Sequence, residues 1–162
     1  MDEHRVCIIV GAGISGVLQA SEIVRKKVLP YEDFEIIDRC GGYGGVWYAN
    51  TYPGCACDVQ SHIYQISWRK NPGALHEPTM PTQTDAEGFT DWSHKYAPQE
   101  EIQQYWDAIA KDHQLERSTS FHTDVKAASW DEKEMLWVVE TENVKTGQKK
   151  VWTCNMVCHV TH

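Results

Sequence analysis

Three closely spaced glycines near the N-terminus have the pattern of a phosphate-binding turn, Gly11-Ala12-Gly13-Ile14-Ser15-Gly16. In such a turn the first glycine permits the sharp exit from a strand, the second lets backbone approach a diphosphate, and the third lets the helix pack closely. The N–H groups and dipole of the helix then favour an anion. An acid, Asp38, follows Gly16 by 22 residues, close to the ~20 typical of a carboxylate that accepts ribose hydroxyls. The pattern predicts that a dinucleotide binds at Gly11, Gly13, Ile14, Ser15, Gly16, Asp38 and Arg39.

A β-α-β unit must position this turn. Val6–Val10 is a short apolar run typical of a strand buried on both faces. Ile14–Lys27 has helical spacing of apolar residues and basic residues in its last turn, and Pro30 blocks further helix. Phe34–Ile37 predicts the second strand, which ends at Asp38.

The middle of the chain changes character twice. Cys40–Pro98 is rich in Gly, Pro and aromatic residues, and a long irregular stretch of this kind in a compact domain is usually functional or disordered. Gln99–His113 predicts a helix with two acidic residues in its first turn. One face of that helix should carry Ile102, Tyr105, Trp106 and Ile109.

The last third alternates with a period of two and predicts an antiparallel β-meander. Its strands are Val125–Trp130, Leu136–Thr141 and Lys150–Thr153, and Met156–Val160 is one more apolar strand. We expect Met156–Val160 to lie parallel and next to Val6–Val10, with Phe34–Ile37 on the other side. The fold class is therefore α/β: a Rossmann-like domain with a parallel sheet plus an antiparallel β-meander. The 162 residues are enough for one such domain. They are too few for two dinucleotide-binding domains, since each needs on the order of 100–150 residues.

Composition restricts the partners and the compartment. The net charge is -8 at pH 7 without a basic run, which argues against binding to nucleic acid or an anionic membrane. No apolar run approaches the ~18 residues of a membrane helix, and the N-terminus lacks the order of a signal peptide. We therefore expect a cytoplasmic protein, in which the six cysteines are not a disulfide framework.

A metal site near the C-terminus is disfavoured by strand geometry. Cys154, Cys158, His159 and His162 have the spacing C-x3-C-H-x2-H. Adjacent residues on a strand point to opposite faces, so Cys158 and His159 cannot easily share one ion. We expect no metal.

The segments after the second strand carry a family resemblance. Gly44–Tyr48, Tyr52–Asp58 and Ser61–Tyr64 closely resemble the Baeyer–Villiger and related FAD-dependent monooxygenases, especially fungal members. The resemblance continues through Tyr96–Pro98 and Phe121–Val125, and it covers essentially the whole chain. It implies a flavoprotein oxidoreductase of fungal secondary metabolism that uses FAD, NADPH and O2 to insert oxygen into an apolar small molecule.

The resemblance also implies roles for individual residues. The glycines match the turn that binds the pyrophosphate, and Asp38 matches the ribose acid, although the family commonly has Glu there. The backbone of Val125 would meet the adenine, and the loop of Gly45, Val46 and Trp47 would wrap FAD.

Three further residues match the flavin end of the family site. Asp58 and Val59 would lie beside the isoalloxazine, and Tyr64 would line the flavin. Asp58 would also lie near the nicotinamide and is the candidate catalytic residue. The alternatives are that Asp58 caps its own loop and that Trp47 and Tyr64 are core side chains.

The second dinucleotide-binding domain of the family is missing from this sequence. The NADPH-binding domain and its glycine motif are absent, and Val160-Thr161-His162 stands where the family has Ala-Thr-Gly. We therefore expect a truncated FAD-binding part, whose last strand is an exposed edge that could pair with a second copy in a homodimer. Three functions remain open: a flavin monooxygenase, a shortened member acting as a redox-neutral cyclase, isomerase or binding module, and a non-functional gene fragment.

Overall fold

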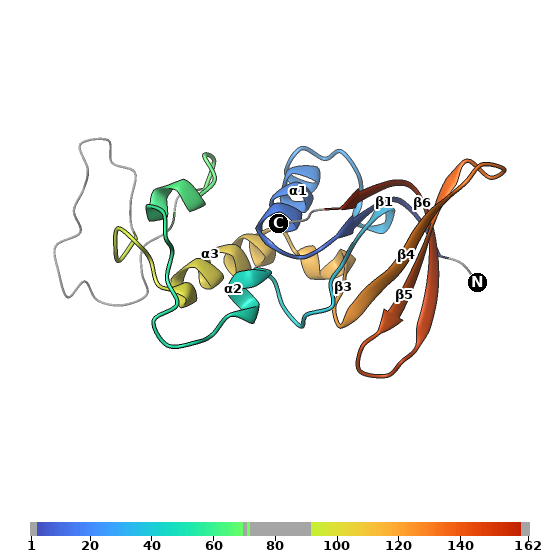
Figure 1. The fold of residues 1–162 in the computed structure, drawn as a ribbon. Helices are drawn as coiled ribbons and strands as arrows, with labels where there is room; N and C mark the ends of the chain where they lie inside the picture. The colour runs from blue at the N-terminus through green and yellow to red at the C-terminus, as the bar shows by residue number, and fades with distance from the viewer. Residues whose placement is uncertain (1–2, 70, 72–91, 160–162) are drawn as a thin grey trace. The chain divides into compact units, whose positions relative to one another are not determined.

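The computed structural model describes residues 3–69, 71 and 92–159 (Figure 1). These residues divide into two compact units. The first unit comprises Met1–Ala49 and Trp106–His162, and the second comprises Asn50–Tyr105. Whether residues 1–162 fold as one domain stays a prediction.

The first unit contains a six-stranded sheet in the order β3-β2-β1-β6-β5-β4 (Figure 1). β1 is parallel to β2 and to β6, and β2 is parallel to β3, whereas β4, β5 and β6 pair antiparallel. This mixed sheet confirms the predicted fold class. The strands are β1 (Glu3–Val10), β2 (Phe34–Ile37), β3 (Thr119–Ser120), β4 (Thr123–Asp131), β5 (Leu136–Asn143) and β6 (Lys149–His159).

β6 joins the two halves of the sheet. On one side it pairs with β5 as far as Trp137 opposite Cys154, and on the other it pairs with β1 from Glu3 opposite Trp152 to Val10 opposite His159. The predicted order of the three parallel strands is confirmed. The prediction of two separate strands in this segment is wrong, because no Gly or Pro interrupts the backbone between them. Val160, the predicted last residue of the strand, lies outside the described residues.

Both predicted helices are present. α1 (Ile14–Arg25) lies beside β1 and ends two residues earlier than predicted, because Lys27 has a left-handed φ of 54° (Figure 1). α3 (Gln99–Asp112) begins in the second unit and ends in the first. The predicted apolar face of α3 is confirmed, since each of its four residues is at most 2% exposed.

Short helical turns complete the first unit. They are α2 (Val46–Ala49), η1 (Tyr31–Asp33) and η3 (Leu115–Ser118). The core of the parallel sheet consists of fully buried aliphatic and aromatic side chains. It includes Ile8, Ile9, Val17, Phe34, Ile36 and Ile37.

The second unit is held together by side-chain hydrogen bonds as well as by a short backbone pairing of residues 55–61 with residues 95–99. The buried Ser61 hydroxyl, at the start of η2 (Ser61–Tyr64), lies 2.9 Å from the His94 carbonyl oxygen and accepts the Ala97 N–H at 2.7 Å. The Tyr105 hydroxyl accepts the Ile66 N–H and donates to the Arg69 carbonyl. Part of the predicted irregular stretch, residues 72–91, lies outside the described residues.

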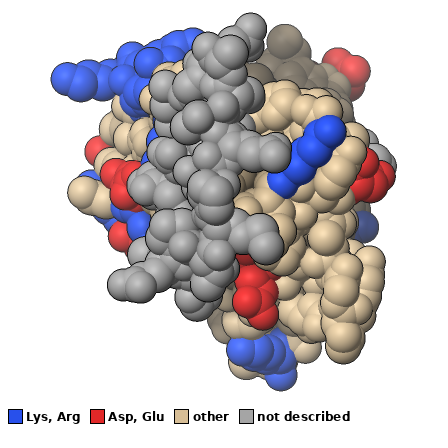
Figure 2. Space-filling model, turned by 90° about the vertical axis from the view of Figure 1, so that its left-hand side faces the viewer, with Lys and Arg blue, Asp and Glu red and all other residues tan. Residues whose placement is uncertain are grey.

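Charged side chains are interspersed on the face displayed in Figure 2. Lys and Arg side chains and Asp and Glu side chains both appear there, in several separate places. Within residues 3–69, 71 and 92–159, no helix has the length and apolar character needed to cross a membrane.

Candidate functional site

The glycine turn connects β1 to α1 and has little room for side chains. Gly11 has a φ of 108°, and its N–H donates to the Ile37 carbonyl at the end of β2 at 2.8 Å. At Gly16 a Cβ would stand 1.9 Å from the Gly11 carbonyl oxygen. Gly11 therefore needs the conformational freedom of glycine, and there is no room for a side chain at Gly16.

The start of α1 is arranged to receive an anion. Gly13 is the N-cap with an extended backbone (φ −71°, ψ −175°), and its carbonyl accepts the Val17 N–H at 2.9 Å. The first turn holds the uncharged residues Ile14, Ser15 and Gly16, so nothing in it repels a phosphate. The N–H groups that open a helix have no partner within the helix, which leaves those of this turn for a ligand.

Asp38 lies at the end of β2 with both carboxylate oxygens hydrogen-bonded. Its Oδ2 accepts the Ala12 N–H and its Oδ1 accepts the Cys40 N–H, each at 2.6 Å. The neighbouring Arg39 is exposed. Asp38 therefore stands where the sequence predicts a ribose acid, but it also bonds to the glycine turn itself.

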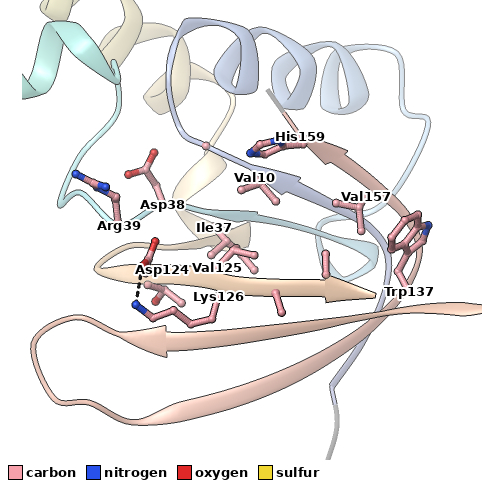
Figure 3. Close-up of a pocket in the computed structure, with 14 residues that line it drawn as sticks. Val10, Ile37, Asp38, Arg39, Asp124, Val125, Lys126, Trp137, Val157 and His159 are labelled. Carbon is pink, nitrogen blue, oxygen red and sulfur yellow. Dashed lines mark hydrogen bonds and ion pairs between the residues drawn. The ribbon is translucent and has the colours of Figure 1, made fainter. Parts of the chain in front are cut away.

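A cavity of about 610 Å³ opens beside the turn (Figure 3). Four of the predicted site residues line it: Gly11, Asp38, Arg39 and Val125. Asp38 and Arg39 lie toward one end and Trp137 lies at the other (Figure 3). A pocket of this size, with charges at one end and an apolar wall at the other, suits a nucleoside.

A β-bulge in β4 lies within the segment that lines this cavity. Val125 pairs with Thr141 but Ala127 pairs with Glu140, so Lys126 is an extra residue in the ladder. Side chains of a regular strand alternate between faces, whereas six consecutive residues, 123–128, line the pocket. The Lys126 ammonium pairs with the Asp124 carboxylate at 2.8 Å (Figure 3), and this bond raises the pKa of Lys126.

Sequence reasoning missed several residues of the pocket wall. Lys126 follows the predicted Val125 at the bulge, which has no glycine to mark it. The others come from β1, β2, β4, β5 and β6 and depend on the sheet register, which sequence alone does not give. They are Val10, Ile37, Thr123, Asp124, Ala127, Ala128, Trp137, Val157 and His159.

The predicted wrapping loop is attached to the glycine turn. The Gly44 N–H donates to the Ala12 carbonyl at 2.9 Å, and Gly44 and Gly45 have φ values of 116° and 59°. Val46 begins α2 and is 42% exposed, whereas Trp47 is 8% exposed. Trp47 is therefore a largely buried side chain, and such packing does not exclude contact with a flavin, so its role stays a prediction.

The three predicted flavin-end residues belong to the second unit. Asp58 and Val59 are exposed in a bend that precedes η2, and Tyr64 is partly buried at its end. Burial raises the pKa of the Tyr64 hydroxyl, and the nearby Cys57 and Asp58 add to this shift. The roles of these three residues stay predictions.

One buried acid in the first unit was not predicted. Glu35 of β2 has 8% of its side chain exposed, accepts the Ser120 hydroxyl at 2.6 Å and lies 3.4 Å from Nε of Arg5. Burial raises the pKa of this carboxyl above its ordinary value of 4.5, although the Ser120 bond and the Arg5 charge oppose the shift.

No group of three or more potential metal ligands occurs among the residues that the structure describes. Of the four terminal residues considered for a metal, His162 lies outside that part of the chain.

Comparisons with known proteins agree with this geometry. Residues 9–76 match the family model for an NAD(P)-binding Rossmann-like domain. The chain is 43% identical over 156 residues to an FAD-binding monooxygenase of Botryotinia fuckeliana, covering 96% of this chain and 26% of that protein. It is 34% identical over 134 residues to a Baeyer–Villiger monooxygenase of Pseudomonas aeruginosa, covering 83% of this chain and 21% of that one.

A solved structure extends the likeness to three dimensions. The polycyclic ketone monooxygenase of the thermophilic fungus Thermothelomyces thermophila superposes with a TM-score of 0.75 at 27% identity. The match covers 98% of this chain and 23% of that structure. The chain thus spans about a quarter of the length of the proteins it matches.

Proposed function

Because this chain belongs to the family of FAD-binding, Baeyer–Villiger-type monooxygenases, we propose that it binds the ADP half of FAD. One observation carries this proposal: Gly11 of the glycine turn, Asp38 and β4 line the same cavity within one compact unit. The turn suits the diphosphate, and the cavity suits adenosine. When bound, FAD supplies the redox and oxygen-activating chemistry of a monooxygenase.

The residues of the first unit have distinct roles in this proposal. The N–H groups of Gly13, Ile14 and Ser15 hold the diphosphate, aided by the α1 dipole. The exposed backbone at the β4 bulge, beside Val125, meets the adenine edge. Gly45, Val46 and Trp47 follow the cofactor from the diphosphate toward the flavin.

The family resemblance implies roles at the flavin end for three residues of the second unit. Asp58 and Val59 would hold the isoalloxazine, and the exposed Asp58 carboxylate would orient a nicotinamide amide. Tyr64 provides an aromatic wall. For the whole protein we propose NADPH- and O2-dependent oxygen insertion into an apolar small molecule, in accord with the names of the relatives.

The test compares cofactors that share only part of FAD. The purified chain is titrated with FAD, ADP, FMN and riboflavin, and binding is followed by flavin fluorescence and calorimetry. FAD and ADP should bind and compete, while FMN and riboflavin should bind more weakly, because they lack the adenosine that fills the cavity. Equal affinity for FAD and FMN, or binding of FAD without competition by ADP, would contradict an ADP-half site.

We also propose that a second copy of the chain pairs along the open edge of β6. Pairing with β5 ends at Cys154, and within the described residues no other strand continues the sheet beyond it on that side. Met156, in the open part, is 49% exposed. Unpaired backbone beside an exposed apolar side chain is a template for another strand, and two-fold symmetry is the default for such a dimer.

A cytoplasmic location is proposed as well. All six cysteines are free thiols, including Cys7 and Cys154, whose pKa values burial raises to about 12 and about 11. Free thiols are typical of a reducing compartment.

A further inference from the structure

Asp38 joins four separate segments of the first unit. Its backbone N–H donates to the Ser120 carbonyl at 3.1 Å, and its carbonyl accepts the Thr123 N–H at 2.9 Å. Its carboxylate accepts the N–H groups of Ala12 and Cys40. These bonds tie the end of β2 to β3, to β4, to the glycine turn and to the loop after β2.

The bond to Ala12 fixes the peptide just before the diphosphate site. Ala12 is fully buried, its N–H is held by Asp38, and its carbonyl accepts the Gly44 N–H. The next residue, Gly13, is the N-cap of α1. The direction in which the N–H groups of the first helical turn point therefore depends on the Ala12 peptide, which the carboxylate holds from one side.

The length of the aspartate side chain is what makes both bonds compatible. A side-chain oxygen that accepts the N–H two residues later, as Oδ1 does with Cys40, closes an Asx turn. Asp and Asn have the reach for this turn, whereas Glu is one methylene longer. Asn offers only one acceptor oxygen, so its NH2 group would face one of the two N–H donors.

We propose that Asp38, besides accepting the ribose hydroxyls, is a positioning residue for the phosphate-binding turn and acts on the diphosphate through Ala12 and Cys40. The inference rests on the proposed binding of FAD. The position of Asp38 at the end of β2 indicates contact with the ribose, and its bonds to Ala12 and Cys40 indicate the positioning role. A carboxylate has about four lone-pair sites, so ribose hydroxyls can bind to the same group.

The test separates the ribose from the diphosphate. ADP, 2′,3′-dideoxy-ADP and adenosine are titrated into the wild-type chain and into Asp38→Asn. Asp38→Asn should weaken dideoxy-ADP about tenfold, as for one lost charge-assisted hydrogen bond, although this nucleotide offers the carboxylate no ribose hydroxyl. Adenosine, which has no diphosphate, should lose less affinity than ADP. If Asp38→Asn leaves the affinity for dideoxy-ADP unchanged, the carboxylate acts only on the ribose and the proposal is wrong.

A second readout needs no nucleotide. Amide hydrogen exchange at Ala12 and Cys40 should be faster in ligand-free Asp38→Asn than in the wild type, and unchanged exchange at both would overturn the positioning role. Asp38→Glu, which keeps the charge but not the Asx turn, should expose Cys40 and replaces Asn if that variant fails to fold. If the wild type binds neither ADP nor FAD, the proposed function fails, and faster exchange in Asp38→Asn would then show only that the carboxylate holds the Ala12 and Cys40 amides.

Asp131 provides a matched control. Its Oδ1 accepts the N–H groups of Lys133 and Glu134 in the β4–β5 turn, so it makes the same kind of bonds. Asp131→Asn should speed exchange at those two amides and leave ADP affinity within error. A loss of ADP affinity in this control equal to that of Asp38→Asn would show a general effect on the fold and contradict the proposal.

Discussion

Gly16 lies directly against the carbonyl oxygen of Gly11, which a Cβ at Gly16 would meet at 1.9 Å. The contact joins the first turn of α1 to the end of β1, and both partners are backbone. It can be relieved only by moving the helix or the strand.

Gly16→Ala should therefore destabilise the chain. The expected loss is about 1–3 kcal/mol in the free energy of unfolding, as for overpacking of a core, measured by urea denaturation. A Gly16→Ala variant as stable as the wild type would contradict the close packing.

Gly13→Val should abolish nucleotide binding without a comparable loss of stability. The backbone at Gly13 (φ −71°, ψ −175°) is open to any residue, so the substitution adds little backbone strain. Its side chain would instead block the approach of the diphosphate. FAD titration and urea denaturation of the same preparation separate the two effects, and unchanged flavin affinity in a folded variant would refute the site.

Glu35 should make stability fall as the pH rises above its ordinary pKa. Because burial raises the pKa of the carboxyl, the folded state favours the protonated form, and that contribution is complete below pH 4.5 and lost as the pH rises through the folded pKa. The stability of the wild type relative to Glu35→Gln should therefore decline from acid toward neutral pH. Urea denaturation of both proteins across this range measures the difference.

Glu22 offers a control of opposite sign. The hydrogen bonds and charges of Arg25 and Lys26 lower the pKa of this exposed carboxyl to about 2. Its contribution is present above pH 4.5 and lost as the pH falls toward 2. The wild type should gain relative to Glu22→Gln as the pH rises, and the same slope for both variants would mean that Glu35 is not desolvated.

Met156→Lys should prevent self-association at the β6 edge. A charge on an edge strand opposes pairing with another strand, and Met156 is exposed enough to accept lysine. Sedimentation at tens of micromolar, roughly the range in which exposed edges associate, should give a dimer for the wild type and a monomer for the variant. Met135→Lys, at a 64% exposed site in the β4–β5 turn, should leave the dimer intact. A monomeric wild type would remove the proposal.

Local sequence patterns predicted the parts of the fold that depend on local rules. The β-α-β unit follows from apolar runs, the glycine spacing and Pro30, and the buried face of α3 follows from its helical period. Asp38 was found by its distance from the glycine turn. Each of these patterns is contained in one short continuous segment of the chain, residues 6–38 or residues 99–113.

Features that depend on long-range pairing were not predictable in the same way. β3 has two residues and exists only because Thr119 and Ser120 pair with β2. The bulge at Lys126 is a property of the register between β4 and β5. The proposed positioning role of Asp38 depends on the hydrogen bond between its carboxylate and the N–H of Ala12, 26 residues earlier. The spacing of residues in the sequence does not show whether this bond forms.

The continuity of β6 has a consequence for how the first unit unfolds. The same backbone pairs with β5 through Lys149–Cys154 and with β1 through Trp152–His159. The meander therefore cannot unfold as an independent subdomain, because β6 belongs to it and also pairs with β1, which leads into the glycine turn. We expect β1, β5 and β6 to open as one cooperative unit. A destabilising substitution in the β4–β5 or β5–β6 turn should therefore reduce the fraction of folded molecules rather than distort the proposed nucleotide site locally.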